Sequence, residues 1–122
     1  MQEFASEIEH PKGIYGVGQW FPGAAANSPA IGPSEATFLA AYTDHTKKRI
    51  DYPGVQAVAG AALAAYCARR TGTTALEPLW AQAAALDTET LFGGFKIDPV
   101  TGAQVKHKAV LVRWADGGLA LA

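Results

Sequence analysis

One long helix without an extended polar face is the feature that most constrains how this sequence can fold. Asp51 is suited to the N-cap, Pro53 to the first turn and Gly72 to the C-terminal cap. Between these ends, one face carries the larger apolar residues and alanines cover the others: Val55, Val58, Ala59, Ala62 and Tyr66, then Ala57, Ala61, Ala64, Ala65 and Ala68. We therefore expect this helix to be buried between partners.

Length and charge limit the possible partners. The 122 residues are 49% apolar and 17% charged, which suits one compact core. The net charge of −1 gives no field that favours nucleic acid or a membrane surface, so neither is an expected partner. The N-terminus lacks a signal peptide pattern and no stretch is long and apolar enough to span a bilayer. We expect a cytoplasmic protein if the reading frame is complete.

Before the long helix, the sequence predicts a short tail, a strand, a loop and a helix. Residues 1–12 form a tail or a short helical turn at Glu3 to Glu9, and the single domain then covers 13–122. Ile14 to Phe21 is a glycine-bearing strand, and Pro22 to Pro33 is a long loop. The next helix has Ser34 as its N-cap and ends at the basic triplet Lys47-Lys48-Arg49.

After the long helix, we predict a third helix and a C-terminal hairpin. Thr74 to Glu77 has the pattern of a capping box, and an apolar stripe follows at Leu76, Leu79, Trp80, Ala83 and Leu86. Leu91 to Ile97 is predicted to pair with Val105 to Trp114 across the turn Asp98 to Gly102. The later strand is apolar on both faces, so we expect it to be central and covered on both sides. Asp116-Gly117-Gly118 then predicts a turn before a short final strand from Leu119 to Ala122. Three packed helices followed by a hairpin give an α+β fold class.

Catalytic chemistry has little support in the sequence. His10, His45 and His107 fall in different predicted elements, without metal-ligand spacing. Cys67 is the one cysteine, so no intrachain disulfide can form, and we expect it to be a small buried apolar residue. The glycines at 13, 16 and 18 are followed by Trp20 rather than by a helix start, which argues against a phosphate loop. We expect no catalytic residue, no metal and no cofactor, and a role other than that of an enzyme.

Several segments, taken in order, resemble the end of the type I periplasmic solute-binding proteins, which include the leucine/isoleucine/valine and amide receptors of ABC importers. The resemblance covers about Gly13 to Trp114. It rests on GVGQWFP at 16–22, FLAAY at 38–42, DYPGVQA at 51–57, LFGGFKIDPVTG at 91–102 and AVLVRW at 109–114.

The resemblance implies part of an α/β fold with two lobes, three crossovers and closure on a ligand by hinge bending. In that arrangement, residues 17–22 are a crossover strand, the helices from 34 to 86 belong to the N-terminal lobe, and the predicted hairpin returns across the hinge. The start of the long helix faces the cleft, so Tyr52 and Asp51 are the expected ligand contacts, followed by Trp20 and Gln19 near the hinge. A small amino acid or amide is the implied ligand, and the family is periplasmic.

The chain departs from the family because both parallel sheets and most of the cleft are absent. Three alternatives remain open at this point. The chain is a truncated binding module with a partial small-molecule site, or an interaction module that has lost ligand binding and forms homo-oligomers through its freed helical faces. The third is an unrelated small α+β protein whose later strands only echo the family.

Overall fold

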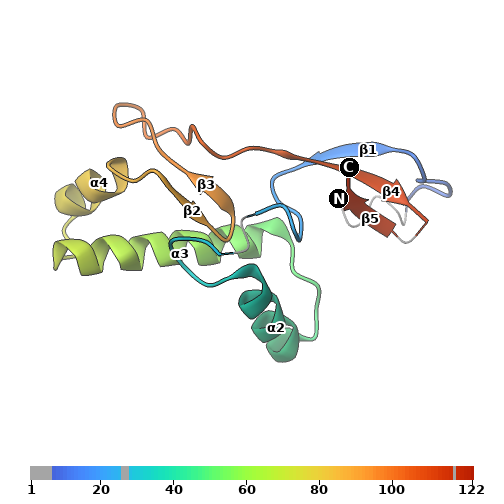
Figure 1. Ribbon diagram of the computed structural model, residues 1–122, viewed down its shortest axis with the longest axis horizontal. Helices are drawn as coiled ribbons and strands as arrows, with labels where there is room; N and C mark the ends of the chain where they lie inside the picture. The colour runs from blue at the N-terminus through green and yellow to red at the C-terminus, as the bar shows by residue number, and fades with distance from the viewer. Residues whose placement is uncertain (1–6, 26–27, 117) are drawn as a thin grey trace.

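The fold is α+β, as predicted, with three helices and small antiparallel sheets in the part of the chain that the structure describes (Figure 1). It was obtained as a computed structural model that describes residues 7–25, 28–116 and 118–122. Most of the predicted turn at Glu3 to Glu9, two residues of the predicted loop and Gly117 therefore lie outside the described residues. The elements in chain order are β1 (Tyr15–Gly18), α2 (Glu35–Thr46), α3 (Tyr52–Thr71), α4 (Leu76–Ala84), β2 (Thr88–Thr90), β3 (Gly93–Phe95), β4 (Val110–Ala115) and β5 (Gly118–Leu121).

Local capping chemistry fixes the ends of the two longer helices. The Ser34 hydroxyl accepts a hydrogen bond from the Thr37 N–H at 3.2 Å, and the Asp51 carboxylate accepts one from the Tyr52 N–H at 2.8 Å. Gly72 ends α3 in the left-handed conformation at φ 70°, which glycine adopts without steric cost. All three predicted caps are confirmed.

The predicted capping box at the start of α4 is wrong. Ala75 occupies the N-cap position and makes no side-chain hydrogen bond there. Instead the Thr73 hydroxyl accepts from the Ala75 N–H at 3.1 Å, which orders the turn before the helix. The helix ends at Ala84, so Leu86, the last residue of the predicted apolar stripe, lies beyond the helix.

The predicted hairpin between Leu91–Ile97 and Val105–Trp114 is also wrong. β3 pairs with β2, whereas β4 pairs with β1 and β5 in a three-stranded sheet of order β1-β4-β5. Around the expected turn at Asp98 to Gly102, the described residues of the two segments meet only locally. Ile97 forms an isolated bridge with Gln104, and the Val105 N–H donates to the Lys96 carbonyl at 2.8 Å. The first strand is shorter than predicted and ends at Gly18.

β4 is the central strand of its sheet, as predicted, but it is not covered on both faces. Val112 and Trp114 are buried on one face, while Leu111 is 51% exposed on the other. Val17 pairs directly with Leu111 and is also exposed. The three-stranded sheet therefore has one buried face and one open face.

The core lies where the segment after β1 crosses the helical part of the chain. Trp20, Val55 and Leu91 form its centre, and the partly buried residues packed against it are Phe38, Leu39, Ile50, Val58 and Phe92. The core thus ties together the N-terminal segment, the start of α3 and the turn after β2. It brings α2 to the rest of the fold mainly through Phe38 and Leu39.

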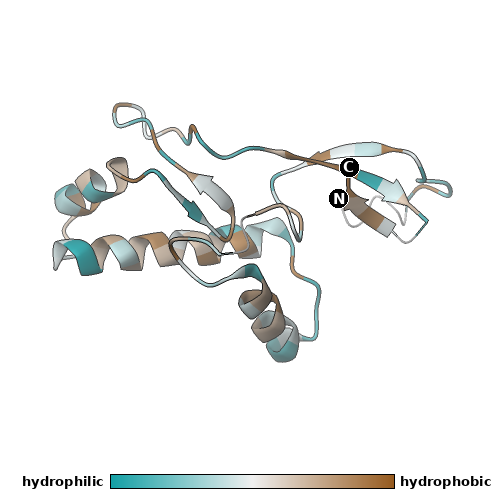
Figure 2. Cartoon of the chain, viewed as in Figure 1, coloured by the Kyte–Doolittle hydropathy of each residue, from teal (hydrophilic) through white to brown (hydrophobic). Residues whose placement is uncertain are grey.

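α3 is the longest helix and is far less buried within this chain than its composition predicts. It packs against α4, yet only Val55, Ala59 and Cys67 of its residues are buried. Figure 2 shows α3 as pale or brown along most of its length, with strongly hydrophilic residues at its C-terminal end. Within the described parts of the chain, no helix combines the length and apolar character that a membrane crossing requires.

Candidate functional site

A hollow of about 240 Å³ lies beside the N-terminal end of α3 and contains two of the four predicted site residues. Trp20 and Asp51 both line it, although 31 positions separate them in the sequence. The hollow combines an apolar surface with two opposite charges. Its lining residues are Trp20, Phe21, Pro22, Leu39, Thr43, Arg49, Ile50, Asp51 and Leu119.

Trp20 forms a fixed wall of this hollow. Its side chain is 6% exposed, and its indole Nε1 donates a hydrogen bond to the Leu91 carbonyl at 3.1 Å. A buried indole needs such an acceptor, and the bond also sets the orientation of the ring. The aromatic surface at the hollow is therefore preorganised by the core.

Arg49 and Asp51 supply the two charges. One Asp51 oxygen, Oδ1, accepts from the Tyr52 N–H, so the N-cap bond holds the carboxylate in place and leaves Oδ2 for another donor. Arg49 forms no ion pair within 4.0 Å with any other residue that the structure describes. A guanidinium and a carboxylate thus lie at one hollow without neutralising each other in a direct pair.

The other two predicted residues lie elsewhere. Tyr52 is 39% exposed. It does not line this hollow, and it does not line the two other hollows near the β2–β3 hairpin. Gln19 lines hollows of about 380 and 320 Å³ on the side of the β2–β3 hairpin. Trp20 and Asp51 thus line the hollow of about 240 Å³ together. Gln19 shares the hollow of about 380 Å³ with Trp20, and Tyr52 lines none of the three.

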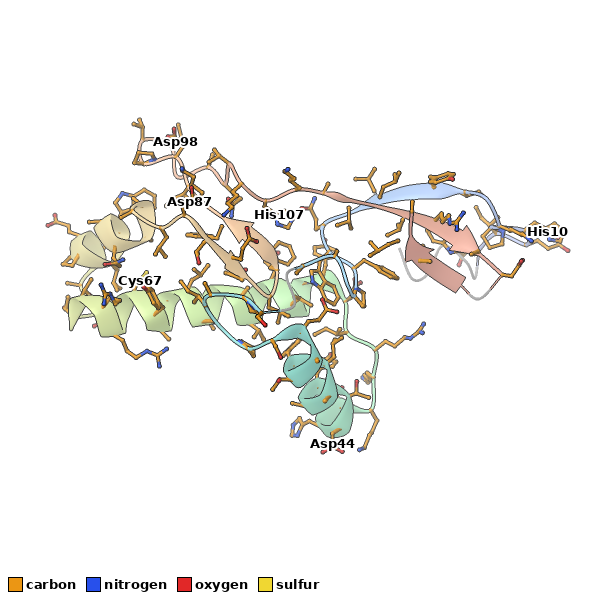
Figure 3. The ribbon with its side chains drawn as sticks, in the orientation of Figure 1. His10, Asp44, Cys67, Asp87, Asp98 and His107 are labelled. Carbon is orange, nitrogen blue, oxygen red and sulfur yellow. The ribbon has the colours of Figure 1, made fainter. Side chains whose placement is uncertain are left out.

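His107 organises the region around Gln19. Its Nε2 donates to the Gln19 carbonyl at 2.9 Å, because a carbonyl oxygen can only accept. The imidazole stacks on Phe92 with ring centroids 4.4 Å apart and 3° between planes. Figure 3 shows His107 at the long connection that leads to β4, far from His10. His107 thus ties this connection to the hairpin and to the segment after β1.

Arg49 and Leu119 are lining residues that the sequence did not single out. The sequence predicted Arg49 as a cation at a helix end, but α2 already ends at Thr46. The spacing of Arg49 and Asp51, which puts a cation two positions before a capping carboxylate, was the available signal. Leu119 lies in β5 and had no local signal, since its approach to the hollow depends on the tertiary fold.

Comparisons with protein-family models, curated protein sequences and solved structures find no match to this chain. Among the described residues, no group of three or more His, Cys, Asp and Glu side chains could hold a metal ion. Burial raises the pKa of the Cys67 thiol, which disfavours the reactive thiolate.

A network of ion pairs surrounds the second strand pair. Asp87 accepts from Lys96 and from Lys106, both at 2.8 Å, and Lys106 also pairs with Glu89 at 3.1 Å. The hydrogen bond from Lys106, followed by that from Lys96, lowers the pKa of Asp87 from 3.8 to about 2. The network connects the segment before β2, the residue after β3 and the connection to β4.

This network predicts a pH dependence for the hairpin region. The pKa of Asp87 is depressed in the folded state, so its contribution to stability is present above the unfolded value of 3.8 and is lost as the pH falls through about 2. Carbon-detected NMR of the Asp87 carboxylate should give a midpoint near 2 at low salt and a higher midpoint at high salt, because the side chains are exposed. A midpoint near 3.8 at low salt would show that the pairs do not form.

Proposed function

We propose that this chain is a solute-binding-protein-like module, related to the branched-chain amino acid or amide receptors of ABC importers, with a partial small-molecule site. The observation that carries the proposal is the meeting of Trp20, Arg49 and Asp51 at one hollow. Two of these residues belong to the segments that resemble the family. A role in binding without catalysis is part of the same proposal.

The proposed ligand is a small α-amino acid, because the hollow offers a partner for each of its groups. The Asp51 carboxylate would accept hydrogen bonds from the α-ammonium through its second oxygen. The Arg49 guanidinium presents a planar fork of donors that matches an α-carboxylate. Leu39, Ile50 and Leu119 then offer an apolar surface to an aliphatic side chain.

The site is partial because it is small and its charged groups face water. Its volume of about 240 Å³ lies below the usual range of roughly 300 to 1,000 Å³ for small-molecule pockets. Arg49 and Asp51 are exposed, so water competes for both charges. We therefore expect dissociation constants of the order of 1 mM, equivalent to about 4 kcal/mol of binding free energy.

Asp51→Asn is the variant that best separates ligand binding from folding. Asparagine is as good an N-cap residue as aspartate, so α3 should keep its start. The change removes the charge that would contact the ammonium, and it should weaken leucine binding by about tenfold or more. Calorimetric titration with leucine and with an aliphatic amide, on wild type and variant, measures this loss.

Two further variants complete the experiment. Arg49→Gln should weaken leucine binding by a similar factor but should weaken binding of a neutral amide much less, because the amide has no carboxylate. Lys48→Gln is the matched control, since Lys48 is an exposed cation next to Arg49 that does not line the hollow. Equal affinities for all four proteins, or no heat with any ligand, would contradict the proposal.

A second candidate function is an interaction module that forms homo-oligomers. The exposed apolar faces of α3 and of the β1-β4-β5 sheet favour it, because large open apolar surfaces commonly mark protein contacts. Sedimentation velocity over a wide concentration range tests this candidate. A strictly monomeric profile at all concentrations would count against it.

A further inference from the structure

The segment that leads from β1 to Trp20 is held by the connection that precedes β4. Gly18, the last residue of β1, pairs with Val110. The next residue, Gln19, accepts a hydrogen bond at its carbonyl from His107 Nε2, at 2.9 Å. The backbone is therefore fixed at the two residues immediately before Trp20. These contacts set the path along which Trp20 enters the wall of the hollow of about 240 Å³.

His107 also contacts the neighbour of the residue that accepts from the indole. Trp20 Nε1 donates to the Leu91 carbonyl at 3.1 Å. Phe92, the next residue, stacks on the imidazole of His107 with ring centroids 4.4 Å apart. The segment that carries the indole and the segment that accepts from it are thus joined twice, once by the indole itself and once through His107. Two such connections resist a rotation of the indole that its single hydrogen bond would allow.

The other ring nitrogen of His107 has no polar contact. Because Nε2 carries the proton that Gln19 accepts, Nδ1 of the neutral ring is an acceptor. Nδ1 is buried and has no hydrogen-bond partner among the described residues, and a Cβ added at Gly93 would lie 3.4 Å from it. A buried acceptor without a partner needs a compensating reason. The bond to Gln19 supplies one, since it is the hydrogen bond that this side chain makes within the described parts of the chain.

We propose that His107 is a positioning residue of the ligand site: it holds Trp20 in the orientation that the ligand meets, although His107 does not line that hollow. This inference rests on the proposed function. An indole that is already fixed before binding presents its surface without a further ordering cost. When the contact between His107 and Gln19 is lost, the indole gains freedom that the ligand must then remove. The affinity for leucine therefore depends on a side chain that does not touch leucine.

His107→Gln and His107→Asn form a matched pair of variants. Both remove the imidazole and its stack on Phe92, so both lose packing. The amide nitrogen of glutamine reaches about as far from the backbone as Nε2 and can still donate to the Gln19 carbonyl, whereas asparagine is one carbon shorter. Leucine should therefore bind His107→Asn about two- to tenfold more weakly than His107→Gln, which corresponds to the loss of one hydrogen bond. His10→Asn changes an exposed histidine that lines none of the three hollows, and it should bind leucine as wild type does.

A measurement without ligand separates this inference from the proposed function. The ¹H–¹⁵N signal of the Trp20 indole reports the orientation and the hydrogen bond of the ring. In His107→Gln this signal should stay near its wild-type position, whereas in His107→Asn it should shift and its N–H should exchange faster with water. Failure of wild type to bind leucine would contradict the proposed function, and the indole signal would still decide whether His107 positions the ring.

A measurement on the wild-type protein keeps the test decisive if both variants fail to fold. The ¹⁵N chemical shifts of the His107 imidazole at neutral pH should show a protonated Nε2 and an unprotonated Nδ1. An unprotonated Nε2 cannot donate to Gln19, so that result would overturn the proposal. Two further results would also overturn it: indole signals that change equally in the two variants or in neither, and equal affinities of the two variants for leucine when wild type binds it.

Discussion

Replacing Trp20 by alanine is expected to lower the free energy of unfolding by about 3 to 5 kcal/mol, the usual cost of removing a buried tryptophan. Trp20 is one of the three residues at the centre of the core and is 6% exposed. Its loss leaves a cavity between the start of α3 and the turn after β2, and it leaves the Leu91 carbonyl without its donor. Because small domains are stable by only about 5 to 15 kcal/mol, this loss is a large fraction of the total stability and should clearly lower the urea concentration at the unfolding midpoint.

Urea denaturation followed by circular dichroism measures this effect, with Trp20→Phe as the control. Phenylalanine keeps most of the packing but cannot donate to Leu91, so the expected cost is about 1 to 3 kcal/mol. Both variants should also lose leucine binding, since the indole is a wall of the hollow. A Trp20→Ala protein that unfolds at the same urea concentration as wild type would show that the core is placed wrongly.

The second large effect is expected for Gly102→Ala, at about 2 to 3 kcal/mol from backbone strain and crowding together. Gly102 has φ 72°, and a Cβ there would lie 3.0 Å from the ring of Trp80. The turn that contains Gly102 is held by Asp98, whose Oδ1 accepts from the N–H and the hydroxyl of Thr101 and from the N–H of Val100. The turn therefore cannot easily move away from the indole.

Gly72→Ala is the matched control for the crowding. Gly72 has nearly the same φ, 70°, but nothing lies within 4 Å of its Cβ position. Its substitution should cost only the strain of a left-handed alanine, about 1 kcal/mol. The difference between the two variants, measured by thermal unfolding, isolates the contact with Trp80. Equal costs would mean that the ring of Trp80 swings away freely.

The features that the sequence predicts correctly are local. Ser34 and Asp51 accept hydrogen bonds from N–H groups within the next three residues, and Gly72 needs only its own backbone freedom. Such interactions are complete within one helical turn, so they can be recognised from residue type and position. The predicted capping box at the start of α4 is wrong because Thr73 orders the preceding turn. The Thr73 hydroxyl accepts the hydrogen bond from the Ala75 N–H, and no capping box forms.

The predicted strand pairing is wrong because the partner of a strand is not fixed by the residues near it in the sequence. Proximity in sequence favoured pairing between the segments on either side of the Asp98–Gly102 turn. In the structure, β4 instead pairs with β1, and Val112 lies opposite Gly16, although most of the sequence separates the two strands. The two segments that flank the turn diverge beyond the Ile97–Gln104 bridge, and β3 takes β2 as its partner.

The candidate site also combines residues that could be predicted from local sequence with an arrangement that depends on the tertiary fold. Asp51 could be chosen because it begins a helix that resembles a cleft-facing element, and Trp20 because it lies in the predicted crossover strand near the hinge. Their meeting at one hollow with Arg49 and Leu119 depends on the core that links those segments. Tyr52 was chosen for the same reason as Asp51, but it does not line the hollow.

The most direct test of the central claim is an NMR titration of the isotope-labelled full chain with leucine. If leucine binds in the hollow, the chemical shifts of the Trp20 indole N–H and of the amides of Arg49, Asp51 and Leu119 should change and should saturate at millimolar leucine. Arg69 and Arg70 should not respond, since they lie at the other end of α3. The account would be contradicted by spectra that leucine leaves unchanged, or by shifts confined to the region around His107 and the β2–β3 hairpin.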